Sequence, residues 1–134
     1  MIVNTLVRNQ VVDRLERTLP PERAITVISG WQVIDANQDT PAILVYQDTG
    51  DLNEQYVSDD ERYDGLLMVS VYCAGTSSDD ELDVIGELVR EALPQRTRFP
   101  GVCTLYRNAF QYERSESGVY RALHLTHPYQ SEQS

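Results

Sequence analysis

The sequence of 134 residues is poor in cysteine and has no long apolar segment. Its two cysteines, Cys73 and Cys103, form neither a Cys-x-x-Cys pair nor a metal-ligand spacing, so we expect both to be small core residues. No stretch approaches the roughly 20 apolar residues that span a membrane. The N-terminal residues also lack the basic segment and the apolar run of a signal peptide. We therefore expect a reduced, cytoplasmic protein with no membrane partner.

Basic side chains are scarce as well. The chain has 11 basic residues against 21 acidic ones, which gives a formal net charge of −10 and a pI near 4.5. Tight binding to duplex DNA or to an anionic membrane depends on Lys and Arg side chains that neutralise phosphate, so this balance argues against both. The same acidity also keeps a protein soluble, and the two explanations are compatible.

The sequence contains no recognisable catalytic constellation. His124 and His127 lie three residues apart in an expected strand, so they face opposite sides of the sheet and are poorly placed to chelate one metal ion. Cys103 has no histidine nearby in the sequence. Residues 75–78 (Gly-Thr-Ser-Ser) match neither a phosphate-binding loop nor a nucleophile elbow. The sequence therefore predicts neither an enzyme nor a bound cofactor.

Two amphipathic helices are expected. The first starts near Asn4 or Thr5, whose side chains can cap it, runs to about Leu19 and is stopped by the prolines at 20 and 21. Its apolar stripe consists of Val3, Leu6, Val7, Val11, Leu15 and Leu19. The second helix starts after Ser78, because residues 78–81 (Ser-Asp-Asp-Glu) form the capping-box pattern, and it ends before Pro94.

Five segments have the β-branched, aromatic or alternating pattern of strands, namely residues 24–28, 41–46, 66–73, 105–112 and 119–126. Helices set at the start and in the middle of a run of strands indicate an α+β fold. We expect a mixed, mainly antiparallel sheet of about four to five strands, with two helices packed on one face. The length suits a single domain over residues 1–134.

The connecting segments are polar. Residues 47–62 carry six carboxylates against Arg62 alone, and we expect a long acidic loop or arm there, because such side chains are costly to bury without partners. Residues 32–40 are expected to form a loop pinned by Val33 and Ile34. Residues 96–104 contain a turn at Pro100 and Gly101, and residues 130–134 should form a frayed tail.

A succession of short motifs resembles one known family. The motifs are residues 28–30 (Ile-Ser-Gly), 33–35 (Val-Ile-Asp), 41–46 (Pro-Ala-Ile-Leu-Val-Tyr), 70–72 (Ser-Val-Tyr), 79–83 (Asp-Asp-Glu-Leu-Asp), 111–114 (Gln-Tyr-Glu-Arg) and 122–126 (Ala-Leu-His-Leu-Thr). Their order and spacing resemble the tail terminator of lambda-like bacteriophages, the minor tail protein U family. The chain departs from that pattern at Trp31 and Gln32, where Arg-Pro-like residues are expected, and at residues 20–23, which lengthen a connection.

The resemblance implies a structural virion protein of a long-tailed phage. It implies a hexameric ring that caps the tail tube, stops its polymerisation and offers the surface to which the head attaches. The implied partners are further copies of the chain, the tail tube protein and a head-completion or connector protein. DNA would pass through the channel without specific binding, and an acidic lining suits that passage. The implied location is the head-proximal end of the tail, assembled in the host cytoplasm.

The candidate subunit-interface or channel residues are Asp79, Asp80, Glu81, Asp59, Asp60 and Glu61. Asp79 is the strongest of them, and its alternative role is that of a simple helix cap. Another head–tail connector, a head-closure protein or a tube-like adaptor is the alternative function. A small metal-dependent enzyme that uses the two acidic clusters is a third, because hard cations prefer carboxylate oxygen. A solvated loop and a helix N-terminus explain these clusters more simply.

Overall fold

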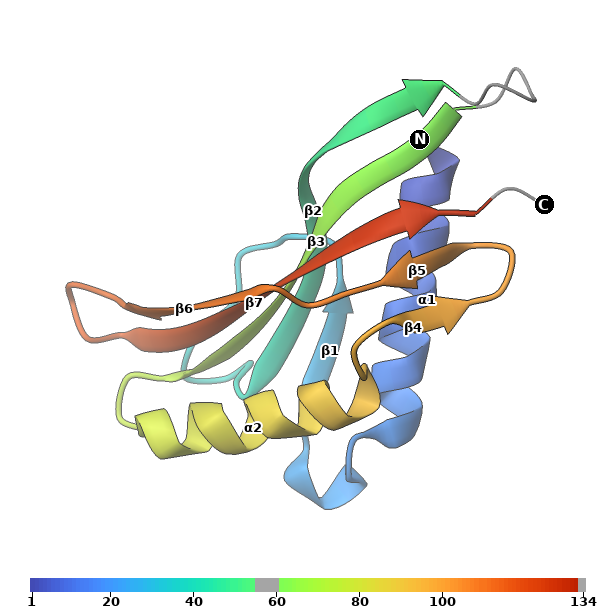
Figure 1. Cartoon of the computed structure of the whole chain (residues 1–134). Coiled ribbons are helices and arrows are strands. Elements are labelled where there is room, and N and C mark those ends of the chain that lie inside the picture. Colours follow the sequence, from blue (N-terminus) through green and yellow to red (C-terminus); the bar gives the residue numbers. More distant parts are fainter. Residues whose placement is uncertain (55–60, 133–134) are drawn as a thin grey trace.

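The computed structural model describes residues 1–54 and 61–132, which form an α+β fold with one mixed sheet (Figure 1). The elements are α1 (Ile2–Thr18), a short 3-10 helix (Pro21–Arg23), β1 (Thr26–Ser29), β2 (Ala42–Glu54), β3 (Glu61–Ala74), α2 (Asp79–Ala92), β4 (Thr97–Phe99), β5 (Cys103–Leu105), β6 (Ala109–Arg114) and β7 (Tyr120–Ser131). The α+β class is as predicted from the sequence.

The sheet has seven strands in the order β1-β2-β3-β7-β5-β4, with β6 also paired to β7. Among the strand pairs of the described residues only β1–β2 is parallel, so the sheet is mixed and mainly antiparallel, as expected. The predicted count of four to five strands was too low. The missed strands are β4 and β5, which flank the predicted turn at Pro100 and Gly101. Each has three residues, too few for a periodic pattern to emerge.

Residues 47–62 were expected to form an acidic loop or arm, and a loop was wrong for most of this length because the described residues form an extended hairpin. β2 continues to Glu54 and β3 starts at Glu61, and the two strands pair in a long hairpin from Gln47 opposite Leu67 to the Glu54–Glu61 pair. The side chains of Asp48 and Asp51 stay exposed, and pairing resumes at Gly50 after a register shift that follows Gln47, so strand formation here requires no burial of these two charges. Residues 55–60 lie outside the described part of the chain.

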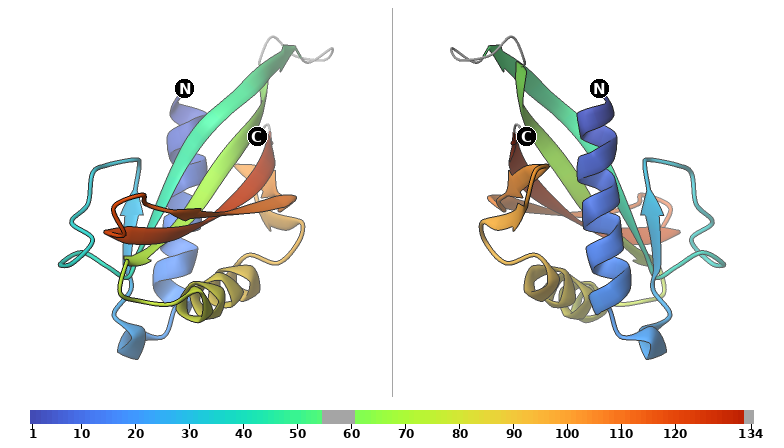
Figure 2. Two further views of the ribbon diagram at one scale, coloured as in Figure 1. Left: turned by 90° about the vertical axis from the view of Figure 1, so that its left-hand side faces the viewer. Right: turned by 90° about the vertical axis from the view of Figure 1, so that its right-hand side faces the viewer.

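This β2–β3 hairpin projects from the end of the molecule opposite α2 (Figures 1 and 2). The expected frayed tail was also wrong where the structure describes it. Gln130 and Ser131 belong to β7, and two contacts fix the position of Glu132, which follows them. The Glu132 amide donates to the Val102 carbonyl at 2.9 Å, and its carboxylate contacts Arg98 Nε at 2.6 Å. Residues 133 and 134 lie outside the described residues.

Both helices pack against one hydrophobic core, and α1 runs across the sheet beside α2 (Figure 2). Arg14 of α1 donates to the Ala92 carbonyl at the end of α2 at 3.2 Å. The core includes the side chains of Val7, Val11, Leu15, Ile43, Val45, Leu67, Val69, Val71, Leu82, Ile85, Val89, Leu123 and Leu125, together with both cysteines. The prediction that Cys73 and Cys103 are core residues is confirmed, and burial raises the pKa of Cys103 to about 12.

The two helix starts differ from one another. At α2 the Ser78 hydroxyl accepts a hydrogen bond from the Glu81 amide at 3.2 Å, so the predicted cap is confirmed. At α1 no side chain of the described residues caps the helix, which begins at Ile2, and Asn4 and Thr5 lie inside it. Leu6, expected in the apolar stripe, remains 45% exposed. The first-turn residues of α1 therefore do not provide the predicted cap.

Candidate functional site

The acidic start of α2 is tied to the strands of its own chain. The Asp79 carboxylate contacts Arg121 Nη1 of β7 at 2.8 Å and Arg114 Nη2 of β6 at 2.5 Å. The Arg114 hydrogen bond, with Arg121 adding to it, lowers the pKa of Asp79. Ser78, and not Asp79, caps the helix, so the alternative role assigned to Asp79 was wrong. Asp79 instead joins the first turn of α2 to β6 and β7.

The other candidate acidic residues are distributed over both ends of the molecule. Glu81 lies 3.3 Å from Arg23 of the 3-10 helix, and Asp80 is exposed. Glu61 is exposed at the start of β3, on the projecting hairpin. Asp59 and Asp60 lie outside the described residues. The structure therefore does not bring Glu61 close to the acidic start of α2.

A hydrogen-bonded cluster that sequence reasoning missed lies on the sheet face turned away from the helices. Ser70 Oγ lies 2.7 Å from His124 Nδ1 and 3.2 Å from Tyr46 Oη. His124 Nε2 lies 2.7 Å from one Glu113 oxygen, and Tyr120 donates to the other at 2.8 Å. The first of these contacts, with His124, lowers the pKa of Glu113, and Tyr120 lowers it further. The cluster spans β2, β3, β6 and β7, so it requires the strand pairing.

This cluster has the Ser–His–carboxylate order of a nucleophilic triad but lacks an accessible nucleophile. Ser70 is 0% exposed, so its hydroxyl is closed to a substrate carbonyl. Tyr72 packs beside it, with ring centroids 5.8 Å from both Tyr120 and His124. The arrangement is suited to holding the open face of the sheet rigid. His124 on this face and His127 in the core do lie on opposite sides, as predicted.

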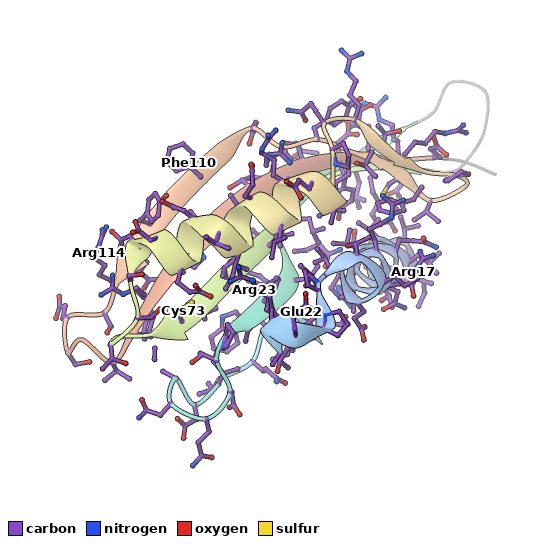
Figure 3. The ribbon with its side chains drawn as sticks, turned by 90° about the horizontal axis from the view of Figure 1, so that it is seen from below. Arg17, Glu22, Arg23, Cys73, Phe110 and Arg114 are labelled. Atoms are coloured by element: carbon purple, nitrogen blue, oxygen red, sulfur yellow. The ribbon has the colours of Figure 1, made fainter. Side chains whose placement is uncertain are left out.

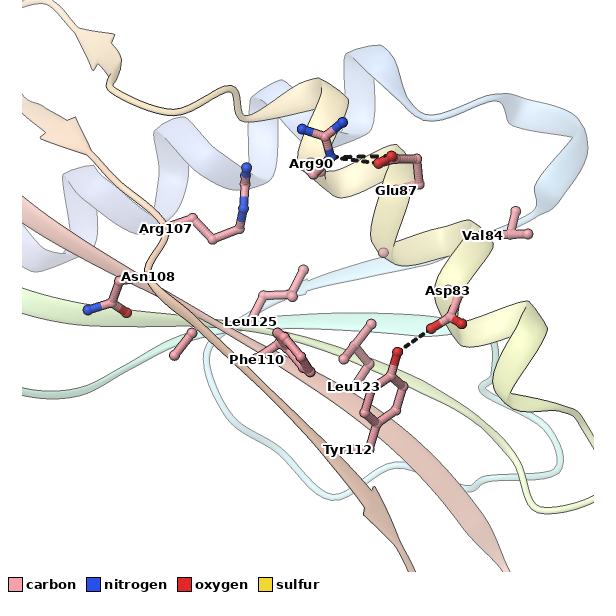
Figure 4. A pocket seen from close by; sticks show the side chains of 12 residues that line it. Asp83, Val84, Glu87, Arg90, Arg107, Asn108, Phe110, Tyr112, Leu123 and Leu125 are labelled. Carbon is pink, nitrogen blue, oxygen red and sulfur yellow. Dashed lines mark hydrogen bonds and ion pairs between the residues drawn. The ribbon is translucent and has the colours of Figure 1, made fainter.

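A groove with a volume of about 650 Å³ separates α2 from β6 and β7 (Figure 4). Leu123 and Leu125 form its apolar floor. Gly86 lets α2 approach the floor closely, since a Cβ at that position would lie 2.8 Å from the side chain of Leu123. Val84 and Phe110 stand at the rim and are 40% and 70% exposed. The result is an open apolar surface on one side of the molecule.

Charged side chains border the same groove. Arg90 Nε contacts Glu87 at 2.6 Å, and the Tyr112 hydroxyl donates to Asp83. Arg107 donates to the Leu93 carbonyl at 2.9 Å and has no carboxylate within ion-pair distance in the described residues. The groove therefore has an apolar centre and, at the Arg107 end, a cation whose charge is not matched by a neighbouring carboxylate.

A second exposed apolar surface lies on the segment between β1 and β2. Trp31 is 64% exposed and Val33 is 84% exposed. The expectation that Val33 and Ile34 pin this segment was wrong for Val33; Ile34 is half-buried, and Ala36 is buried. In both views of Figure 2 the segment lies on the side of the molecule opposite α2. Trp31 departs from the family pattern, but the sequence alone does not show that its side chain is exposed.

Within residues 1–54 and 61–132, no group of three or more His, Cys, Asp or Glu side chains is arranged to hold a metal ion. Neither helix in that part of the chain is long and apolar enough to cross a membrane.

Both the sequence and the fold are similar to those of known proteins. Residues 2–129 match the family described as phage minor tail protein U. A chain in a solved structure titled "Virion of native gene transfer agent (GTA) particle" has the same fold, with a TM-score of 0.60 and 14% identity over 91% of each chain. No curated protein matches the sequence.

Proposed function

We propose that this chain, which belongs to the phage minor tail protein U family, is a ring-forming tail terminator. In this role copies of the chain form a closed ring, a hexamer by the resemblance, on the end of the tail tube. The ring stops addition of tube protein and offers its outer surface to a head-completion or connector protein. The location is the head-proximal end of the tail, and the role is structural and not enzymatic.

The observation that carries the proposal is the family match over residues 2–129. The fold agrees with it, because it is shared with a chain from a virion particle. Two exposed apolar surfaces, at Trp31 and at Phe110, support assembly, because exposed apolar patches of a soluble protein mark interaction sites. The net charge of −10 suits a channel that DNA traverses without being held by phosphate contacts.

The candidate acidic residues fit this proposal unequally. Asp80 and Glu61 have exposed side chains and are available to a channel or to a subunit contact. Asp79 is engaged with Arg114 and Arg121 of its own chain. Replacing Asp79 by Asn keeps its size and removes its charge. Ring formation that is lost in Asp79→Asn while the fold is retained would place this carboxylate near the subunit interface.

The test of the proposal is polymerisation of the cognate tail tube protein with and without this chain. We expect capped tubes to stop growing, so that electron microscopy shows shorter tubes with rings on one end. As a control, the chain is added to tubes whose ends an earlier addition of the same chain has already capped. This second addition should have no further effect on tube length. Tubes that grow to the same length at every concentration of the chain would contradict the terminator role.

The alternative virion roles give a different result in the same assay. A head-closure protein would bind the head connector and leave tube growth unchanged. A tube-like protein would add to the tubes along their length. Binding to isolated heads, measured by co-sedimentation in the absence of tails, separates the first of these from a terminator.

A further inference from the structure

One of the two exposed apolar surfaces is a groove and the other is a chain segment, and they lie on opposite sides of the molecule. The groove has an apolar floor and a rim residue, Phe110, that is 70% exposed. On the far side the segment between β1 and β2 (Figure 2) contains Trp31 and Val33, whose side chains are 64% and 84% exposed. A surface and its complement on opposite sides of a subunit give a head-to-tail contact, which closes into a ring when the rotation between subunits allows.

We propose that the α2–β6 groove of one copy receives the Trp31–Val33 segment of the next copy, and that this contact joins neighbouring subunits. The inference rests on the proposed ring and names the surfaces that build it. Figure 3 shows Phe110 standing outward from β6, free of the helix. Its neighbour Tyr112 packs edge to face against it, with ring centroids 5.9 Å apart, so an incoming indole meets an aromatic rim.

The size of the groove fits such an occupant. A volume of about 650 Å³ lies within the range of roughly 300–1,000 Å³ typical of sites that enclose a bound group. Trp is also the residue most suited to anchor an interface, since it buries about 150–250 Å² of surface with few rotatable bonds. Trp31 is the only tryptophan of the chain, and its side chain is exposed.

The charges agree with this pairing. The segment from residue 30 to residue 40 carries Asp35 and Asp39 and no basic residue, and both aspartates are exposed. Each carboxylate also accepts a backbone hydrogen bond of its own turn, which holds the segment in shape. The facing cation is Arg107, at the end of the groove. An acidic segment therefore meets the groove at its unmatched positive charge.

The test uses single cysteines placed on the two surfaces. The substitutions Gln32→Cys and Ala109→Cys lie at exposed neighbours of the two anchors and leave both aromatic side chains in place. The two variants are purified separately, mixed, allowed to assemble and oxidised mildly. We expect covalent dimers only in the mixture, because a head-to-tail contact brings position 32 of one copy to position 109 of the next. The native cysteines Cys73 and Cys103 are 3% and 0% exposed and should stay reduced in the wild-type control.

Ile2 provides a matched control, because it is 73% exposed and lies on neither surface. Gln32→Cys mixed with Ile2→Cys should give no dimer. In sedimentation, Phe110→Asp should raise the dissociation constant of the ring at least about tenfold, as expected for loss of an aromatic anchor, while Ile2→Asp leaves it unchanged. Circular dichroism should show that both variants keep the wild-type fold.

The failures of this inference and of the proposed function are separable. Wild-type rings without mixed dimers, or with normal assembly of Phe110→Asp, would overturn the groove contact and leave the terminator role standing. Dimers of Gln32→Cys with itself would show a symmetric contact and would also overturn it. Wild-type protein that forms no ring and caps no tube would remove the proposed function, and this contact with it.

Discussion

The two faces of the sheet accommodate histidine in opposite ways, although the same strand supplies both residues. On the open face both ring nitrogens of His124 have partners, in Ser70 and Glu113. On the face covered by α1 and α2, His127 is 1% exposed, and neither ring nitrogen has a hydrogen-bond partner among the described residues. The open face is held by directed hydrogen bonds, while the covered face is held by packing that tolerates one unpaired polar ring.

This difference has an electrostatic consequence. Burial, with a smaller effect from the Arg107 charge, lowers the pKa of His127 to about 4. The ring therefore remains neutral in the folded protein at pH 7. An apolar face can enclose a polar group of this kind only in its neutral form, because a buried charge without a partner costs far more.

The largest expected effect is a cavity on the covered face. Ile85 of α2 is 0% exposed, so Ile85→Ala should lower the free energy of unfolding by about 2–5 kcal/mol. Val84 is its neighbour in the same helix and is 40% exposed. Val84→Ala should change the value by less than about 1 kcal/mol. Urea unfolding at pH 7 measures both, and similar losses in the two variants would contradict the assignment of the two sides of α2.

The second largest expected effect is a loss of folding stability in acid, caused by His127 on the covered face. The pKa of His127 is lowered from 6.5 to about 4 on folding, so the unfolded chain takes up the proton first as the pH falls. The stability present above pH 6.5 is then lost progressively down to about pH 4, by about 3 kcal/mol in total. The measurement is the free energy of unfolding between pH 7 and pH 4.

His127→Leu isolates this contribution from that of the carboxylates. Because both ring nitrogens lack partners, an apolar side chain of similar size should cost little at pH 7. The variant should lose less stability than the wild type between pH 6.5 and pH 4. Parallel pH curves for the two proteins would show that His127 is not the group responsible.

On the open face a smaller loss should follow from one missing hydroxyl. Ser70→Ala removes the partner of His124 Nδ1 at a position that is 0% exposed, which should cost about 1–2 kcal/mol. Ser117→Ala, in the exposed turn before β7, is the control and should change stability by less than about 0.5 kcal/mol. Equal effects on urea unfolding would mean that the cluster contributes no stability of its own.

Features encoded locally in the sequence were predictable. The cap of α2 depends on Ser78 and Glu81, three residues apart, and the alternation on β7 placed His124 and His127 on opposite sides. The family motifs also depend on local order and spacing. These predictions required only helix and strand geometry, which short stretches of sequence determine.

Features that depend on pairing between distant strands were not predictable in this way. The acidic residues Asp48 and Asp51 indicated a loop, yet they lie in a hairpin whose backbone pairing is independent of their charge. The Ser70 cluster combines side chains from four strands, and the groove combines α2 with β6 and β7. No spacing in the sequence reveals these contacts, because strand order determines them.

The smallest expected effect concerns the charged side chains on the outer surface of the molecule. Within the described residues, seven of the 11 basic side chains pair with a carboxylate of their own chain, namely Arg17, Arg23, Arg62, Arg90, Arg98, Arg114 and Arg121. In that part of the chain few cations, such as Arg8 and Arg107, remain for contacts between copies, whereas each copy has a net charge of −10. Like charges within a Debye length of about 8 Å at physiological salt repel one another.

Added salt should therefore strengthen assembly modestly, by screening this repulsion while leaving the apolar contact at Phe110 intact. Each exposed ion pair that salt weakens is worth only about 0–1 kcal/mol, so the repulsive contribution should dominate. Sedimentation from low to high salt measures the change, and Arg107→Gln is the matched variant. Rings that dissociate as salt rises in the wild type, but less so in Arg107→Gln, would show instead that ion pairs across the interface outweigh the repulsion between the acidic chains.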